Sequence, residues 1–166
     1  VTGVQTCALP ISRIQLDPGA LSLSSSVVLA ALVTVGVPAA LLVAAMGYVL
    51  GDILRRRFST TTVFNSAQAV LAVLVAAFVY HAAGGTMGGS AIAFFLPQAV
   101  FLGTYFLANH ALVGIALLLG KGSISWAEYK YLVLWDLVAT LLALPMGAFL
   151  AEMYEHLGRW ALSLAS

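Results

Sequence analysis

The chain has 166 residues, of which 62% are hydrophobic and only 8% are charged, and its net charge is +1. A water-soluble domain carries about 25% charged residues, so this composition excludes a soluble globule and indicates an integral membrane protein whose outer surface faces lipid. The small net charge also excludes a basic surface for nucleic acid. The lipid bilayer is therefore the expected partner.

The first eleven residues, VTGVQTCALPI, differ in composition from the rest of the chain. They resemble the translation of a sequencing-adapter oligonucleotide, so we interpret residues 1–11 as an artefact and leave them out of the fold. The only cysteine, Cys7, lies there, and no disulfide or thiolate chemistry is predicted elsewhere. We expect a pre-membrane segment at 12–23, a transmembrane domain at 24–157 and the truncated start of a further helix at 158–166.

The first apolar stretch, residues 27–54, is too long for one straight span, because about 20 helical residues cross the 30 Å hydrocarbon core. Gly36 and Pro38 interrupt it, since proline lacks a backbone donor and disfavours helix in the preceding residue. The sequence therefore predicts a short helix over 24–35 and a full span over 38–54. A single kinked, tilted helix is the alternative.

Three further spans are predicted, over residues 61–83, 92–119 and 132–153. The last of them carries Pro145 and Gly147, which weaken its hydrogen-bond ladder, so we expect a helix break at Pro145 and a moving element there. Polar residues at 152–159 indicate a connection, after which a fifth span starts at Trp160. The predicted fold is all-α: a polytopic transmembrane helical bundle with a broken first helix and about four spans plus a truncated fifth.

Basic residues in short loops set the orientation of a membrane protein. If the spans alternate, five basic residues fall on one side and only Arg159 falls on the other. We expect the richer side to be cytoplasmic and the glycine-rich loop at 84–90 to lie outside. The five topology determinants are Arg55, Arg56, Arg57, Lys121 and Lys130.

Polar side chains inside lipid are costly unless they face the bundle interior, so each is a candidate site residue. Gln98, Tyr105 and Asn109 recur at spacings of seven and four, which places them on one helical face. His110 lies about 100° round the helix from its neighbour Asn109. On the preceding span, Asn65 is expected to meet Asn109. The full candidate set is Asn65, Gln68, Gln98, Tyr105, Asn109, His110 and Asp136.

These groups have two interpretations, and hydrogen bonding between helices is favoured over a ligand pocket, because such bonds average only about 0.6 kcal/mol and are used freely in membranes. Asp136 either faces inward or reaches toward the cytoplasmic interface. Asp52 is interpreted as the ion-pair partner of the arginine triplet. No metal-ligand set, cofactor motif or catalytic motif is present, so we expect no metal, no cofactor and no enzymatic activity in this segment.

Four strings carry a family resemblance: LSLSSSVVLAALVTVGVP, GYVLGDILRRR, VFNSAQAVLAVLVAAFVYHAAGG and YFLANHALVGIALLLGKG. In this order, over residues 16–155, they resemble the N-terminal integral-membrane sensor module of bacterial HD-GYP and GGDEF proteins, which turn over cyclic di-GMP. The most specific marks are Gly36 with Pro38, the cluster at 52–57, Phe64 with Asn65, and Tyr105 with Asn109. The family usually has the glycine and proline adjacent, whereas this chain inserts Val37.

The resemblance implies a multi-pass domain of the bacterial inner (cytoplasmic) membrane that passes a conformational signal to a cytoplasmic effector in the same chain. It also implies a homodimer formed through the full-length protein. Two alternatives remain. One is the small-molecule-binding subunit of an energy-coupling-factor transporter, because broken helices commonly build midplane substrate sites. The other is a membrane anchor that mainly dimerises its effector.

Overall fold

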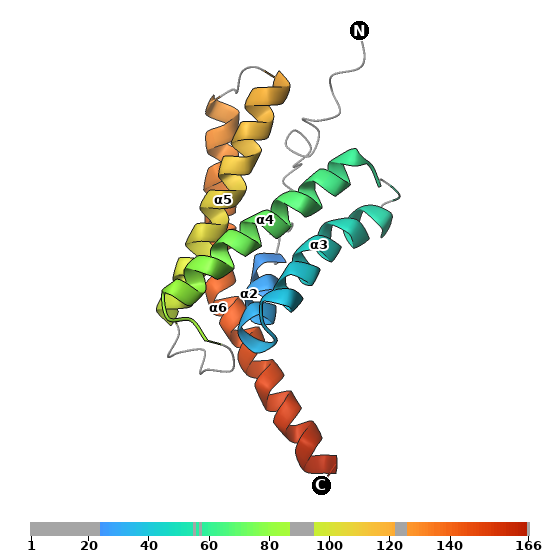
Figure 1. Cartoon of the computed structure of the whole chain (residues 1–166), viewed down its shortest axis with the longest axis vertical. Coiled ribbons are helices and arrows are strands. Elements are labelled where there is room, and N and C mark those ends of the chain that lie inside the picture. The colour runs from blue at the N-terminus through green and yellow to red at the C-terminus, as the bar shows by residue number, and fades with distance from the viewer. Residues whose placement is uncertain (1–23, 55, 57, 87–94, 122–125, 166) are drawn as a thin grey trace.

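The computed structural model describes residues 24–54, 56, 58–86, 95–121 and 126–165. They form five helices, shown in Figure 1, and no strand occurs among them. The helices are α2 (Ser24–Thr34), α3 (Val37–Leu54), α4 (Thr60–Ala82), α5 (Phe95–Lys121) and α6 (Trp126–Ala165). The last four each contain an apolar segment long enough to cross a membrane: Val37–Leu54, Thr60–Ala82, Phe95–Ala116 and Val133–Leu157. The expected all-α, multi-pass membrane bundle is confirmed.

The first apolar stretch is divided into two helices at Gly36. The backbone φ of Gly36 is 109°, a value that suits glycine because it has no Cβ. Its N–H donates to the carbonyl of Ala31 at 2.9 Å, which closes the last turn of α2. Pro38 lies in the first turn of α3, where no helical donor is needed. The chain therefore reverses between α2 and α3, and the alternative of one kinked helix is wrong.

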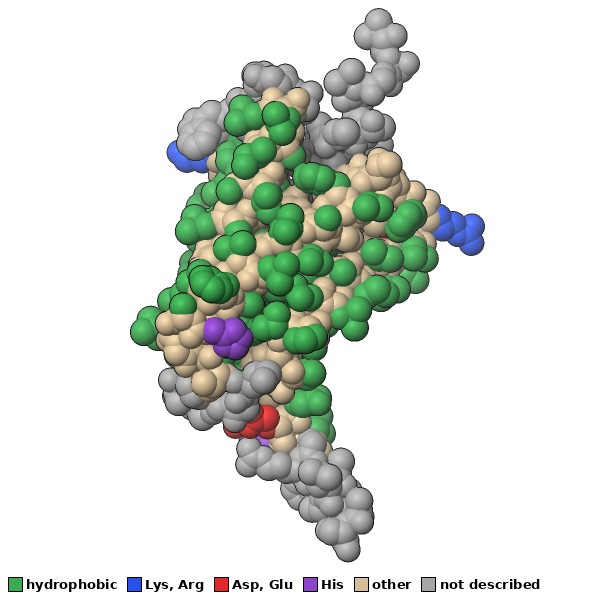
Figure 2. All heavy atoms as spheres, viewed as in Figure 1, with side chains coloured by type: hydrophobic (Ala, Val, Ile, Leu, Met, Phe, Trp, Pro, Cys, Tyr) green, Lys and Arg blue, Asp and Glu red, His purple; other side chains and the backbone are tan. Residues whose placement is uncertain are grey.

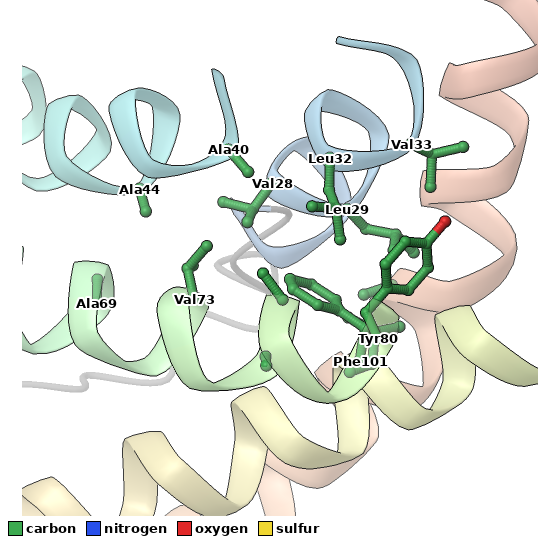
Figure 3. Close-up of a cluster of buried hydrophobic side chains, with 14 of the residues drawn as sticks. Val28, Leu29, Leu32, Val33, Ala40, Ala44, Ala69, Val73, Tyr80 and Phe101 are labelled. Carbon is green, nitrogen blue, oxygen red and sulfur yellow. The ribbon is translucent and has the colours of Figure 1, made fainter. Parts of the chain in front are cut away.

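The short helix α2 packs against both α3 and α6, while α4 packs against α3 on one side and α5 on the other. Figure 3 shows the buried cluster where these helices meet, with Leu29 and Leu32 from α2 beside Val73 and Tyr80 from α4 and Phe101 from α5. All five side chains are fully buried. Because α2 has only 11 residues and more than half of them are buried, it lies inside the bundle and is too short to span a membrane.

Polar contacts tie the end of α3 to the start of α4. The hydroxyl of Thr62 donates to the carboxylate of Asp52, and the backbone N–H of Ser59 donates to the same hydroxyl at 3.0 Å. Thr62 is fully buried, so this junction is closely packed. Asp52 therefore bonds to Thr62 and, within the described part of the chain, not to Arg56, whereas Arg55 and Arg57 lie outside the described residues.

The longest helix, α6, differs from expectation, because its 40 residues continue through Pro145 and through the polar segment 152–159. Pro145 is an exposed residue inside the helix and does not break it. Glu152 and His156 pair at 3.4 Å one turn apart, which supports the helix where a connection was expected. The expected break at Pro145 is therefore wrong, and so are the expected end of the span at residue 153 and the start of a new span at Trp160, because one helix runs on to Ala165.

Gly147 allows α2 and α6 to approach closely. A Cβ added at Gly147 would lie 2.7 Å from Cδ2 of Leu29 and 3.1 Å from the carbonyl oxygen of Ser26. On the same face of α6, Ala143 and Ala151 are buried. The contact between α2 and α6 therefore depends on small residues along one face of α6.

The four long helices alternate in direction, so their connections gather at two ends of the bundle. The end of α3 and the start of α4 lie toward the upper end in Figure 1, as do the end of α5 and the start of α6, whereas the start of α3 and the end of α4 lie at the lower end. On the face shown in Figure 2, the blue basic side chains lie in the upper part. Arg56 and Lys130, both exposed, belong to the upper end. The orientation of these ends across a membrane stays a prediction.

Candidate functional site

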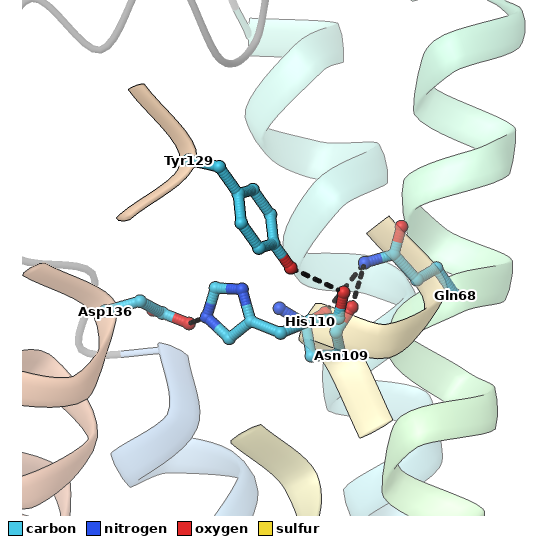
Figure 4. Close-up of polar contacts among 5 residues, drawn as sticks. All are labelled: Gln68, Asn109, His110, Tyr129 and Asp136. Carbon is cyan, nitrogen blue, oxygen red and sulfur yellow. Dashed lines mark hydrogen bonds and ion pairs between the residues drawn. The ribbon is translucent and has the colours of Figure 1, made fainter. Parts of the chain in front are cut away.

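A cluster of polar side chains from α4, α5 and α6 lies around Asn109 and His110 of α5 (Figure 4). The amide of Gln68, on α4, donates from Nε2 to Oδ1 of Asn109 at 2.8 Å and lies 3.4 Å from the backbone carbonyl of the same residue. The Gln68 side chain is buried, with 8% of its surface exposed. This amide pair therefore joins α4 to α5 inside the membrane-spanning region.

The side chain of His110 contacts α6, on the other side of α5 from α4. Its Nε2 lies 2.9 Å from Oδ2 of Asp136 on α6. An ionised carboxylate only accepts hydrogen bonds, so Nε2 carries the hydrogen when Asp136 is charged. The imidazole is 8% exposed, and its Nδ1 has no hydrogen-bond partner among the described residues. Asp136 therefore faces α5, although 43% of its side chain is still exposed.

Tyr129 completes the cluster from the first turn of α6. Its hydroxyl donates to the backbone carbonyl of His110 at 2.8 Å. The hydroxyl lies beside Gly114, where an added Cβ would make an ordinary contact with the tyrosine oxygen at 3.5 Å. Burial raises the pKa of the Tyr129 phenol above its ordinary value of 10.0, which keeps the hydroxyl a donor. Tyr129 is not among the candidate residues, so the sequence analysis missed its contact with His110.

Aromatic rings flank the imidazole. The ring of Phe106 meets that of His110 edge-on with centroids 4.5 Å apart, and the ring of Tyr129 does so at 6.1 Å. The phenols of Tyr48 on α3 and Tyr105 on α5 lie close enough to Asp136 to interact electrostatically with its carboxylate. The cluster is therefore one carboxylate and one imidazole surrounded by aromatic and amide groups.

Two of the candidate residues lie apart from the cluster. Gln98 is fully buried in α5, but it precedes Asn109 by about 16 Å of helix. Asn65 is half-buried on α4, and among the described residues no hydrogen bond joins it to Asn109. The expected pairing of Asn65 with Asn109 is therefore wrong. Gln68, nearly one turn further along α4 and with a longer side chain, takes its place.

Tyr105 contributes packing on the same face of α5. Its ring stacks on that of Phe101 with centroids 6.3 Å apart and planes at 13°, and the ring of Phe101 in turn meets that of Tyr80 edge-on at 6.3 Å. The candidate cluster is thus continuous with the buried core. The structure brings together Gln68, Asn109, His110 and Asp136, with Tyr105 beside them.

The donor set of the cluster suits protons and hydrogen-bonding groups better than a metal ion. Within the ranges that the structure describes, no three histidine, cysteine, aspartate or glutamate side chains converge. One imidazole and one carboxylate leave most positions of a transition-metal site unfilled. The groups that meet instead form hydrogen bonds between α4, α5 and α6.

The chain matches the family MASE9 over residues 1–165, and it belongs to that family. MASE domains are membrane-associated sensor modules, so this chain is a multi-pass, membrane-associated sensor domain. No curated protein and no solved structure matches it.

Proposed function

We propose that this MASE9 domain responds to a stimulus inside the bacterial inner membrane and passes a conformational signal to a cytoplasmic effector of the HD-GYP or GGDEF type, which turns over cyclic di-GMP. The family assignment supports the sensor role. The resemblance of residues 16–155 to modules that precede such effectors supports the choice of effector.

The contact of His110 with Asp136 carries the proposal. Asp136 lies near the start of α6, and α6 continues from there along the whole bundle to Ala165. A stimulus that changes the distance between α5 and the start of α6 therefore changes the position of the entire helix. A sensor needs such an element, because a ligand shifts a conformational equilibrium only when it binds two arrangements with different affinity.

The proposal includes an orientation and an assembly. With the basic residues at the cytoplasmic side, the far end of α6 faces the outside, so a further crossing separates it from a cytoplasmic effector. Effectors of this kind are proposed to act as a homodimer formed by the full-length protein. Both features follow from the proposed role and are open to direct test.

The test uses the complete gene. We expect the sequence downstream to encode a soluble HD-GYP or GGDEF domain, and membranes containing the full-length protein to turn over cyclic di-GMP. The substitutions Asn109→Leu and Asp136→Asn should change basal turnover by about threefold or more, because a change of 0.6 kcal/mol in a two-state equilibrium is a factor of about three.

Leu107→Ala is the matched control, since Leu107 lies on α5 beside the cluster and its side chain is 67% exposed. Its basal turnover should equal that of the unmodified protein. Two results contradict the proposal: a gene that encodes only membrane helices, as for a transporter subunit, or unchanged turnover in both cluster variants when each is normally inserted.

A further inference from the structure

The pair formed by His110 and Asp136 lies inside two spans, Phe95–Ala116 and Val133–Leu157. A carboxylate in a span is costly unless its charge is balanced. Of the basic side chains that the structure describes, Arg56 and Lys130, neither is paired with Asp136. With a neutral imidazole the pair carries one negative charge, and uptake of one proton makes it neutral overall.

The other groups around the pair leave this charge unbalanced. α6 provides the phenol of Tyr129, α5 that of Tyr105 and α3 that of Tyr48, all of which are neutral near pH 7. α4 provides the uncharged amide of Gln68, and α2 carries no titratable side chain. Because no cation faces the pair in the described residues, a proton is the simplest species that neutralises it.

The structure also has a place for the proton. Nε2 of His110 is engaged by Asp136, while Nδ1 is buried and has no hydrogen-bond partner among the described residues. Protonation of Nδ1 gives an imidazolium whose Nε2–H still donates to the carboxylate, so a hydrogen bond becomes an ion pair.

The consequence falls on the contact between α5 and α6. Two side-chain hydrogen bonds at this contact involve His110: Nε2 of His110 bonds to Asp136, and the hydroxyl of Tyr129 donates to the His110 carbonyl. Farther along, α6 is held by α2 at Gly147. A stronger attraction at Asp136 therefore draws the first turns of α6 toward α5 while the contact at Gly147 acts as the pivot.

We propose that the pair of His110 and Asp136 is a proton-binding site, and that uptake of one proton moves the start of α6 toward α5. This rests on the proposed sensor function and names its stimulus as a proton. The site is neutral and closed at low pH, and it is negatively charged and loosened at high pH.

The test measures a distance in the full chain in lipid nanodiscs. With Cys7→Ser as background, spin labels are placed through Leu119→Cys on α5 and Lys130→Cys on α6, since both side chains are exposed. Acidification from about pH 9 to about pH 5, a range that brackets histidine titration, should shorten the label distance by about 1–2 Å, the size of helix shifts at interfaces. The change of label distance with pH should fit the uptake of one proton.

Variants assign the proton to the pair. His110→Gln and Asp136→Asn should each abolish the pH-dependent shortening, and Asp136→Asn retains a hydrogen-bonding group of the same size. The other two histidines are the controls: His81 contacts the carbonyl of Gly85 at 3.0 Å, and His156 pairs with Glu152. His81→Gln and His156→Gln should leave the transition unchanged.

A label distance that is independent of pH in the unmodified chain overturns the proposal. So does a transition that persists in the double variant of His110→Gln and Asp136→Asn. Failure of the proposed signalling function would give a different experimental result. If the distance responds to pH but effector turnover in the full-length protein does not, the proton site stands and the proposed signalling role fails.

Discussion

Asn109 and His110 are consecutive residues of α5, yet their side chains bond to different helices, Gln68 of α4 and Asp136 of α6. A rotation of about 100° per residue explains the divergence. The peptide group between them is therefore shared by two interhelical contacts. Any shift of α5 about its axis changes both contacts together, which makes this dipeptide the mechanical link between α4 and α6.

The amide pair gives a measurable coupling energy. We expect Asn109→Leu and Gln68→Leu each to lower the free energy of unfolding in mixed micelles, and the double variant to lose less than the sum. The difference should be about 0.6 kcal/mol and at most about 1.7 kcal/mol, as for other hydrogen bonds in membranes. Asn65→Leu should show no coupling to Asn109→Leu, and equal coupling of both amides would contradict the assignment.

Gly147→Ala should destabilise the contact of α6 with α2. The added Cβ would press on Leu29 and on the backbone at Ser26, and overpacking costs about 1–3 kcal/mol. The loss should be smaller in a Leu29→Ala background, where one of the two obstacles is removed. Gly103→Ala is the matched control, because a Cβ there meets nothing within 4 Å. A neutral Gly147→Ala would show that α2 and α6 lie farther apart.

Gly36→Ala should reduce stability through the backbone rather than through packing. At a φ of 109° an alanine is strained, at a cost of about 1–3 kcal/mol. Gly51→Ala tests the opposite case, since a Cβ there meets nothing within 4 Å and lies inside α3. It should be neutral or stabilise by up to about 1 kcal/mol. Equal effects of the two substitutions in thermal unfolding would argue against the sharp break.

Single cysteines test the membrane orientation. In a Cys7→Ser background, cysteines replace Phe58 at the junction of α3 with α4 and Thr86 after α4, both exposed. An impermeant thiol reagent added to intact cells should label the cysteine at position 86 and not that at 58. Labelling of the two in inverted vesicles should be reversed. Equal labelling of both from outside would overturn the orientation.

Pro145→Ala tests α6 as the moving element. Proline lacks an N–H, so the carbonyl one turn earlier in α6 lacks its helical donor. Alanine restores that bond, and the exposed position admits it without a clash. In the full-length protein we expect altered basal effector turnover with normal membrane insertion. Unchanged basal turnover together with an unchanged response to pH would exclude α6 as the transmitting helix.

The sequence was sufficient to predict most of the helical architecture, because the length of an apolar span and the glycines at its ends are local properties. The division at Gly36 and the ends of α4 at Thr60 and Ala82 agree with prediction to within one residue. Pro145 misled the prediction of α6. A proline favours a break in isolation, but packing of the residues around Gly147 against α2 holds the helix together on both sides of it.

The candidate site was only partly predictable. Helical periodicity correctly separated the directions of Asn109 and His110, since that depends on one helix alone. The hydrogen-bond partner of each side chain was harder to predict, because it depends on how two helices cross. Gln68 rather than Asn65 meets Asn109, and Tyr129 reaches the carbonyl of His110. No pattern within a single helix contains that information.

The position of Gly147 makes α6 a lever with two arms of nearly equal length. At 1.5 Å per residue the helix extends for about 26 Å from Lys130 to Gly147 and for about 27 Å from Gly147 to Ala165. In a stiff rod pivoted at Gly147, a displacement of about 1–2 Å at the start of α6 produces an opposite displacement of about the same size at its far end. A change of one charge at Asp136 would therefore reach the opposite end of the bundle undiminished.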